Sequence, residues 1–219
     1  MAAENPIDEL LGLERQLLAE EFLFIGGVDE AGRGPLAGPV VAACVVFPDF
    51  RNLPHVNDSK QLTAARREEL EVEIKNFPGV RWAVGIVDAA EIDRINILQA
   101  TYAAMRKAIE GVGRVDIVLV DGNPVPGLPV KSRSVVKGDA KSASIAAASI
   151  LAKVCRDRMM TDFDLRYPEY GFAGHKGYGT AAHLRALEKY GACEIHRRSF
   201  APVKRIVEGT PEQLDFWKN

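Results

Sequence analysis

Two adjacent acidic residues, Asp29 and Glu30, come directly after an apolar run and stand just before the turn Gly32-Arg33-Gly34. Adjacent carboxylates repel each other, and bringing them together is costly unless a cation lies between them. Mg²⁺ and Mn²⁺ are hard cations that prefer oxygen ligands. Glycines on both sides of Arg33 let the backbone approach another molecule, and free N–H groups there can meet polar oxygens. The segment therefore indicates a metal beside a phosphate or a sugar.

Two further acids stand where a carboxylate could join this site. Asp121 ends the apolar stretch 115–120, and strand ends are where α/β sheets place their functional sites. If the strands that carry Asp29 and Asp121 are neighbours, these two carboxylates converge. Glu30 can serve the same site only if its strand bends, because successive strand side chains point to opposite faces. Asp139 precedes a long predicted helix, so the sequence leaves open whether it is a metal ligand or a helix N-cap.

An aromatic residue and a basic run are the remaining candidates for binding. Tyr178 stands between two glycines and close to Lys176, which is typical of a platform on which a sugar or base stacks. The alternative is a loop that tucks Tyr178 into the core. The run 196–200 fits phosphate contacts and a solvated basic turn equally well. The four histidines have no common metal-ligand spacing, so no zinc site is predicted.

The composition is that of an ordinary globular protein: 219 residues, 47% hydrophobic and 26% charged, with a net charge of −2. Basic residues outnumber acids in 131–158 and 175–205, which fits either a polyanion along one face or two solvated helix faces. The three cysteines match no disulfide or zinc spacing and fit a reducing compartment. With neither a signal peptide nor a membrane-length apolar run in view, we expect a cytoplasmic protein.

The order of predicted elements indicates an α/β protein with a mixed sheet. Strands are expected at 22–29, 40–47, 80–87, 115–120 and 130–136, and helices at 8–21, 63–75, 88–110, 141–167, 180–190 and from Thr210. The first helix would bury Leu10, Leu11, Leu13, Leu17 and Leu18, and Gly171 to Gly179 would be a loop. We expect an N-terminal helical extension at 1–21, a catalytic domain at 22–165 and a C-terminal helical extension at 166–219.

Taken together, these motifs resemble bacterial-type ribonuclease HII, the type 2 ribonuclease H. They follow one another in the order of that family between about residue 22 and residue 203, and their combination is highly specific. The matching runs are Val28–Val40, Asp58-Ser59-Lys60, Asp121-Gly122, Lys137-Gly138-Asp139, Ser144–Val154 with Arg156-Asp157, Gly174–Thr180 and His196–Phe200.

The resemblance implies a ribonuclease H-like mixed sheet flanked by helices, with a small helical extension at the C-terminus. It implies that Asp29, Glu30, Asp121 and Asp139 hold two divalent ions, Mn²⁺ or Mg²⁺, which favours Asp139 as a ligand. It further implies that Gly32-Arg33-Gly34 reads a ribose 2′-OH, that Ser59 and Lys60 contact phosphate, and that Tyr178 stacks on the deoxyribose after a ribonucleotide.

The implied activity is metal-dependent hydrolysis by a monomer. Its substrates would be the RNA strand of RNA–DNA hybrids and single ribonucleotides embedded in DNA, cut on their 5′ side. Two other classes use the same residues differently. A DNA-cutting enzyme with the same acids would need no 2′-OH, and a binding module would never cleave, although acids next to phosphates give a pure binder no advantage.

Overall fold

The structure is a computed structural model that describes residues 10–56 and 62–209. Ser59, Lys60 and the helix predicted from Thr210 lie outside the described residues. The chain divides into two compact units. Unit 1 takes the residues up to 31 together with 41–86 and 101–155, and unit 2 takes 32–40, 87–100 and the residues from 156 onward. Unit 2 thus includes two segments that lie within the predicted catalytic domain at 22–165.

Unit 1 is built on a mixed sheet of five strands, as the order of elements predicts. Their spatial order is β3 (Arg81–Val87), β2 (Val40–Val46), β1 (Ile25–Ala31), β4 (Ile117–Asp121) and β5 (Lys131–Val135). Strand β1 is antiparallel to β2 and parallel to β4, which is parallel to β5. Every residue of β2 is buried, because both faces of the sheet are covered.

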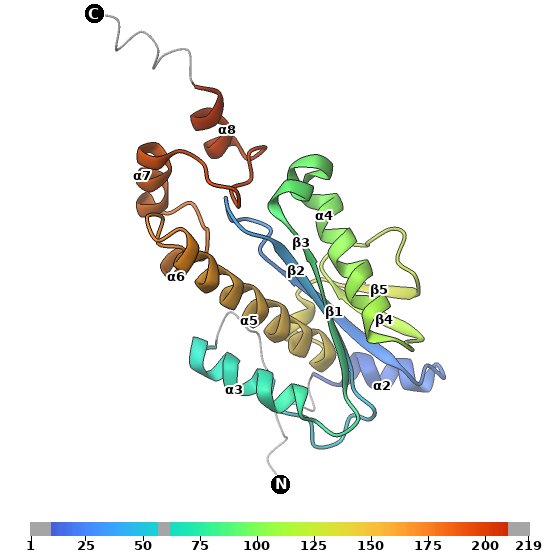
Figure 1. The fold of residues 1–219 in the computed structure, drawn as a ribbon. Coiled ribbons are helices and arrows are strands. Elements are labelled where there is room, and N and C mark those ends of the chain that lie inside the picture. Colours follow the sequence, from blue (N-terminus) through green and yellow to red (C-terminus); the bar gives the residue numbers. More distant parts are fainter. Residues whose placement is uncertain (1–9, 57–61, 210–219) are drawn as a thin grey trace, which may run out of the picture. The chain divides into compact units, whose positions relative to one another are not determined.

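Helices cover the two faces of this sheet (Figure 1). On one face lie α3 (Ala64–Lys75) and the unit 1 part of α5 (Ala143–Arg166), whose alanines share a core with Ala43 and Val45 of β2. On the other face lies the unit 1 part of α4 (Ala89–Val112), where a Cβ at Gly85 of β3 would meet the carbonyl oxygen of Ala104 at 2.0 Å.

Helix α5 crosses β1 at very short range. A Cβ on Gly27 would lie 2.0 Å from the carbonyl carbon of Ser144 and 2.3 Å from the nitrogen of Ile145. Only a residue without a side chain fits there. The small-residue face of α5 therefore packs against the sheet. This close contact sets the position of the start of α5 relative to β1.

The short helix α2 (Gly12–Ala19) completes the start of α5. Glu14 is fully buried, and its Oε1 accepts hydrogen bonds from Ser142 Oγ at 2.6 Å and Ser144 N at 3.0 Å. Burial nevertheless raises the pKa of this carboxyl. Leu11 and Leu17 are buried as predicted, but Leu18 is 41% exposed, so its predicted inward position is wrong. Leu18 directly follows the buried Leu17, and consecutive residues of a helix point in different directions.

Two helix starts confirm the predicted caps, and one break was not foreseen. The Thr63 hydroxyl accepts from Arg66 N, and the Asp88 carboxylate accepts from Glu91 N. The predicted helix 88–110 is interrupted at Asn96, which has a φ of 67°. Its side-chain oxygen accepts from the backbone N–H groups of Leu98 and Gln99 and so begins a new helical segment.

Unit 2 contains three short helices: α6 (Phe172–His175), α7 (Ala181–Tyr190) and α8 (Ala201–Glu208). Helix α6 lies inside the predicted loop 171–179, and α8 was not predicted. A cluster of Ala37, Met160, Tyr170, Phe172 and Ile195 forms the larger of its cores. Across the described ranges, no helix combines the length and apolar character needed to cross a membrane.

Candidate active site

Asp121 ends β4, and Asp29 lies beside it in the parallel strand β1, which continues past Asp29 to Ala31. The register pairs Val28 of β1 with Val120 of β4, so the acids that follow are neighbours on the same face. That face is the one covered by α5, because Ile25, Leu119 and Ile145 share one core cluster. The two carboxylates are therefore neighbours as expected, but the predicted strand end at Asp29 is wrong because β1 continues to Ala31.

Asp29 is held in an environment that disfavours its charge. It is 5% exposed, and its pKa is raised well above the usual range, first by burial and then by the charges of Glu30 and Asp121. Two neutral donors act in the opposite direction. They are the backbone N–H of Glu30, 2.7 Å from Oδ1, and the side chain of Ser149. The role of Ser149 was missed because a serine in a run of alanines signals only close packing.

Asp121 is tied to the turn that carries Asp139. Its Oδ1 accepts a hydrogen bond from Gly138 N at 2.6 Å, and a Cβ on Gly138 would lie 3.2 Å from the same oxygen. Asp139 itself is 4% exposed and lies in the single 3₁₀ turn Gly138–Ala140. Ser142 Oγ, rather than Asp139, accepts from the Ile145 N–H at the start of α5. The N-cap interpretation of Asp139 is therefore wrong.

Glu30 occupies a different place from its neighbour. Pairing with β2 continues regularly through Glu30 and Ala31, so the strand does not bend where a shared site was expected to need it. The side chains of Asp29 and Glu30 consequently leave opposite faces of the sheet. Their charges still interact, as the raised pKa of Asp29 shows.

The carboxylates suit a divalent cation. The donors named above for Asp29 and Asp121 are all neutral, and the net effect on the pKa of Asp29 remains upward, so a cation would relieve both burial and repulsion. Within the described residues, no three His, Cys, Asp or Glu side chains already form a closed ligand set. Mg²⁺ is commonly held in this open way, by one or two carboxylates together with waters and substrate phosphates.

In unit 2, two buried arginines organise the segment 32–39. Arg197 donates to the carbonyl oxygens of Gly32, Arg33 and Gly38, at 2.6, 2.9 and 2.9 Å. Arg156 donates to those of Pro39, Ala37 and Lys176, at 3.0, 3.1 and 3.0 Å. The turn Gly32-Arg33-Gly34 is thus fastened by its carbonyl groups.

Arg197 is fully buried, so both interpretations of the run 196–200, phosphate contacts and a solvated turn, are wrong for this residue. Burial and the nearby charge of Arg156 lower the pKa of Arg197 to about 9. Sequence alone does not distinguish a buried arginine from an exposed one when the acceptors are backbone carbonyls.

Tyr178 lies at the surface of unit 2, 47% exposed, so the alternative of a core tyrosine is wrong. A Cβ on Gly34 would stand 3.7 Å from Tyr178 Cε1, which puts the ring beside the Gly-Arg-Gly turn. Leu36 N donates to Gly177 O at 2.8 Å and ties the two segments together. The structure therefore brings these two predicted binding elements into one place.

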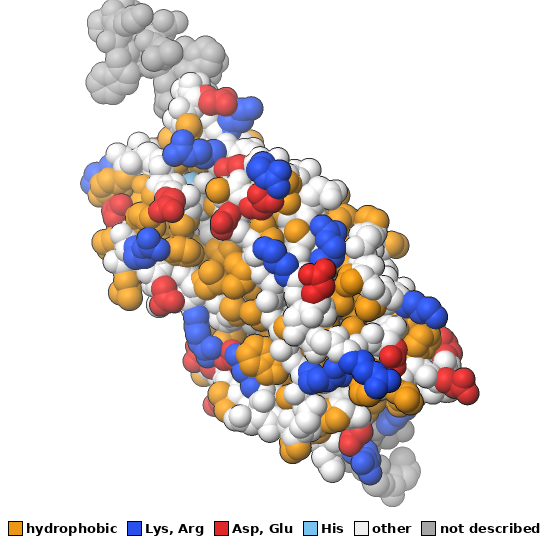
Figure 2. Space-filling model, turned by 45° about the vertical axis from the view of Figure 1, so that its right-hand side comes forward, with side chains coloured by type: hydrophobic (Ala, Val, Ile, Leu, Met, Phe, Trp, Pro, Cys, Tyr) orange, Lys and Arg blue, Asp and Glu red, His pale blue; other side chains and the backbone are white. Residues whose placement is uncertain are grey.

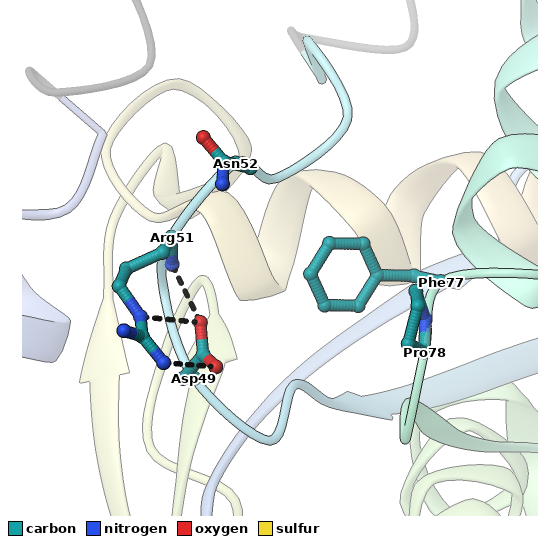
Figure 3. Close-up of a pocket in the computed structure, with 5 residues that line it drawn as sticks. All are labelled: Asp49, Arg51, Asn52, Phe77 and Pro78. Carbon is teal, nitrogen blue, oxygen red and sulfur yellow. Dashed lines mark hydrogen bonds and ion pairs between the residues drawn. The ribbon is translucent and has the colours of Figure 1, made fainter.

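A hollow of about 480 Å³ lies elsewhere in unit 1, lined by Asp49, Arg51, Asn52, Phe77 and Pro78 (Figure 3). It follows the end of β2 that pairs with Gly26, whereas Asp29 pairs with Ala43 farther along. Its polar side is an exposed Asp49–Arg51 ion pair, and none of the predicted site residues lines it. On the face drawn in Figure 2, basic side chains are interspersed with acidic and apolar ones.

Comparison with known proteins supports the resemblance to ribonuclease HII that the sequence motifs indicate. The sequence model of the family Ribonuclease HII matches residues 26–203. A ribonuclease HII of Caldanaerobacter subterraneus subsp. tengcongensis is 52% identical over 204 residues, covering 93% of this chain and 83% of that protein. The ribonuclease HII of Clostridioides difficile is 56% identical over 205 residues, covering 93% and 79%.

Solved structures agree in fold. The ribonuclease H2 of Pyrococcus horikoshii OT3 has a TM-score of 0.71 and 28% identity, covering 90% of this chain and all of that one. The ribonuclease HII of Archaeoglobus fulgidus, solved in complex with PCNA, has a TM-score of 0.71 and 27% identity, covering 81% and 95%. Bst-RNase HIII in complex with Mn²⁺ shares the fold at 18% identity, with a TM-score of 0.61 and coverage of 85% and 70%. With its family model spanning most of the sequence and its relatives above 50% identity, the chain belongs to the ribonuclease HII family.

Proposed function

We propose that this enzyme cuts DNA on the 5′ side of single embedded ribonucleotides, and does so with two divalent ions. As a ribonuclease HII it is a metal-dependent endoribonuclease that hydrolyses the RNA strand of RNA–DNA hybrids. The observation that carries the proposal is the pair Asp29 and Asp121, side by side on two neighbouring parallel strands. Their hydrogen bonds from neutral donors leave the pKa of Asp29 raised.

In this proposal, Asp29, Glu30, Asp121 and Asp139 hold two ions, Mn²⁺ or Mg²⁺. Bound there, divalent ions would lower the pKa of the attacking water and stabilise the departing 3′ oxygen. Ser149 and Gly138 keep the oxygens of Asp29 and Asp121 in fixed directions. Glu30 lies on the opposite face of a strand that does not bend there, so its place in this set rests on the family resemblance.

The turn Gly32-Arg33-Gly34 would recognise the 2′-OH. Its carbonyl groups at Gly32 and Arg33 accept from Arg197, which fixes the backbone of the turn. Successive backbone N–H groups in such a turn can bind an oxygen of the substrate. Tyr178, beside Gly34, would stack on the sugar that follows the ribonucleotide. Ser59 and Lys60 are proposed as phosphate contacts on the strength of the family resemblance alone.

The experiment is cleavage of a DNA duplex with one ribonucleotide, in Mn²⁺ or in EDTA, beside an all-DNA duplex. We expect one metal-dependent cut 5′ to the ribonucleotide, with 3′-hydroxyl and 5′-phosphate ends. Equal cutting of the all-DNA duplex would indicate a general nuclease, and binding without cutting would indicate a binding module. Ends with 2′,3′-cyclic phosphate would overturn the mechanism, because the 2′-OH would then be the nucleophile.

The remaining proposals concern organisation. We propose a cytoplasmic monomer in which 22–165 form the catalytic domain, 1–21 a helical extension and 166–219 a second one. Helix α2 itself belongs to unit 1, where Leu17 joins the cluster of Ile25, Ile117 and Leu119. Gel filtration with light scattering would test the monomer.

A further inference from the structure

Three histidines of unit 2, His175, His183 and His196, take no part in the proposed chemistry. His183 and His196 are among the most buried polar residues of the protein, with 0% and 1% of their surface exposed. Their rings pack with Phe172, which lies 5.4 Å from His183 and 5.6 Å from His196 between ring centroids. A purely apolar cluster would fill this space at less cost, so the hydrogen bonds of the histidines need a separate explanation.

These hydrogen bonds fix the direction in which each imidazole donates. Cys193 N donates to His196 Nδ1 at 3.0 Å, so the proton of a neutral His196 is on Nε2. His196 Nε2 then donates to His183 Nε2, 3.0 Å away. The proton of His183 is therefore on Nδ1, which donates to the carbonyl oxygen of Tyr178 at 2.9 Å. Cys193 Sγ also lies 3.1 Å from His196 Nδ1. The hydrogen bonds thus run in one direction, from Cys193 through the two imidazoles to Tyr178.

This series of hydrogen bonds requires both imidazoles to be neutral, and the surroundings of the two rings favour the neutral form. Burial, followed by the charge of His183, lowers the pKa of His196 to about 4, and burial also lowers the pKa of His183. The groups that face the pair offer no charge to stabilise an imidazolium. His175 stacks on His183 with centroids 4.5 Å apart, Arg198 adds a positive charge near His196, and the ring of Tyr170 packs on His196.

The other side of Tyr178 is held by the third histidine. Tyr178 N donates to the carbonyl oxygen of His175 at 2.9 Å, and Gly177 N donates to His175 Nδ1 at 3.2 Å. Both polar backbone groups of Tyr178 are therefore bonded to histidine residues, and its carbonyl oxygen also accepts from Thr180 N at 2.8 Å. The residue itself is 47% exposed. An exposed ring on a firmly held backbone is pre-organised for stacking, since little freedom is lost when a ligand binds.

We propose that His183 and His196 are positioning residues for Tyr178, and that their directed hydrogen bonds set where its ring meets the sugar after a ribonucleotide. This inference rests on the proposed function, because it needs Tyr178 to contact substrate. Through Tyr178, the two histidines would affect the preference for a single embedded ribonucleotide over a continuous RNA strand. The sugar after a single embedded ribonucleotide is a deoxyribose, whereas in a continuous RNA strand it is a ribose.

The test compares cleavage rates on two substrates, a DNA duplex with one ribonucleotide and a continuous RNA–DNA hybrid. His183→Leu removes the side-chain donor to Tyr178 O, leaving the bond from Thr180 N, and should lower the ratio of the first rate to the second by about 10-fold. His183→Asn keeps an N–H at the place of Nδ1 and should restore most of that ratio. Phe172→Leu is the matched control, because it loosens the same cluster without removing a hydrogen bond and should leave the ratio unchanged.

A second measurement tests whether the histidine variants change the rate ratio through Tyr178. In a Tyr178→Ala background, His183→Leu should change the ratio no further. His196→Leu, which frees the acceptor nitrogen of His183, should lower the ratio in the same direction and serves if His183→Leu does not fold. A ratio that falls equally in Phe172→Leu, or falls again in the Tyr178→Ala background, would overturn the inference.

Failure of the inference can be told from failure of the proposed function. If the wild-type enzyme does not cut at a single ribonucleotide, or if Tyr178→Ala leaves the ratio unchanged, the proposed function is wrong at that point and the inference falls with it. If Tyr178→Ala lowers the ratio but neither histidine variant does, the inference alone is wrong.

Discussion

Asp29, a proposed metal ligand, carries a charge that is unfavourable in the folded protein without a cation. Its carboxyl is buried beside two other acids, and its pKa is raised by burial and by their charges. Asp29→Asn removes a charge that the fold disfavours. We expect the variant to unfold at a higher temperature in EDTA, while cleavage in Mn²⁺ falls more than about 100-fold. Activity close to that of the wild type would exclude Asp29 as a ligand.

Arg197 is a second residue whose role depends on the shape of its side chain. Its guanidinium donates three hydrogen bonds to backbone carbonyls, and a lysine ammonium cannot reproduce that fork. Arg197→Lys should lower the free energy of unfolding by about 3 kcal/mol or more, measured by urea denaturation. Arg198→Lys, at the exposed neighbour, is the control and should change stability little. Equal stability of the two variants would contradict this role.

At the residue level, the acids could be predicted from the sequence and the groups that hold them could not. Asp29 and Asp121 end apolar runs, a pattern that is visible in the chain. Ser149, Arg156 and Arg197 act on partners 117 to 165 residues away, or through backbone carbonyls that carry no sequence signature. Their roles follow only from the packing of distant segments.

Among the elements, the crossing of α5 over β1 depends on one glycine. Gly27→Ala would place a methyl group 2.0 Å from the carbonyl carbon of Ser144, so helix and strand would have to separate. We expect a loss of at least about 3 kcal/mol in the free energy of unfolding. Gly12→Ala in α2, where a Cβ meets nothing within 4 Å, should gain up to about 1 kcal/mol. A Gly27→Ala protein as stable as the wild type would show that α5 can shift freely.

The elements themselves were largely predictable where local chemistry defines their ends. Thr63 and Thr180 begin helices as N-caps, and Gly191 follows the last residue of α7, all visible as local patterns. The break at Asn96 could not be predicted, because it interrupts an otherwise continuous helical pattern in the sequence. Helix α8 follows the run 196–200 and begins where Asp93, about a hundred residues earlier, accepts from the N–H groups of Arg198 and Ser199. A helix end that depends on a residue far away in the sequence cannot be predicted from the local sequence pattern.

For the whole molecule, the buried histidines make stability depend on pH. His196 titrates at about 4 when folded and at 6.5 when unfolded, so the unfolded chain binds more protons between these values. Its contribution is fully present above pH 6.5 and is lost as the pH falls towards 4, an effect of about 3 kcal/mol. His196→Gln cannot titrate and should show a shallower loss of stability in that window. Parallel curves for the two proteins, measured by urea denaturation, would contradict a neutral His196.

The buried carboxylate of Glu14 has a consequence for how the chain folds. Its partner Ser142 lies 128 residues further along, so the contact belongs to the slow, non-local class. Helix α2 is synthesised before α5, yet its acid stays in water until the start of α5 has been made and has packed on the sheet. We expect α2 to dock among the last elements. Hydrogen exchange during refolding would then show late protection of the Ser144 amide, the proton that Glu14 holds.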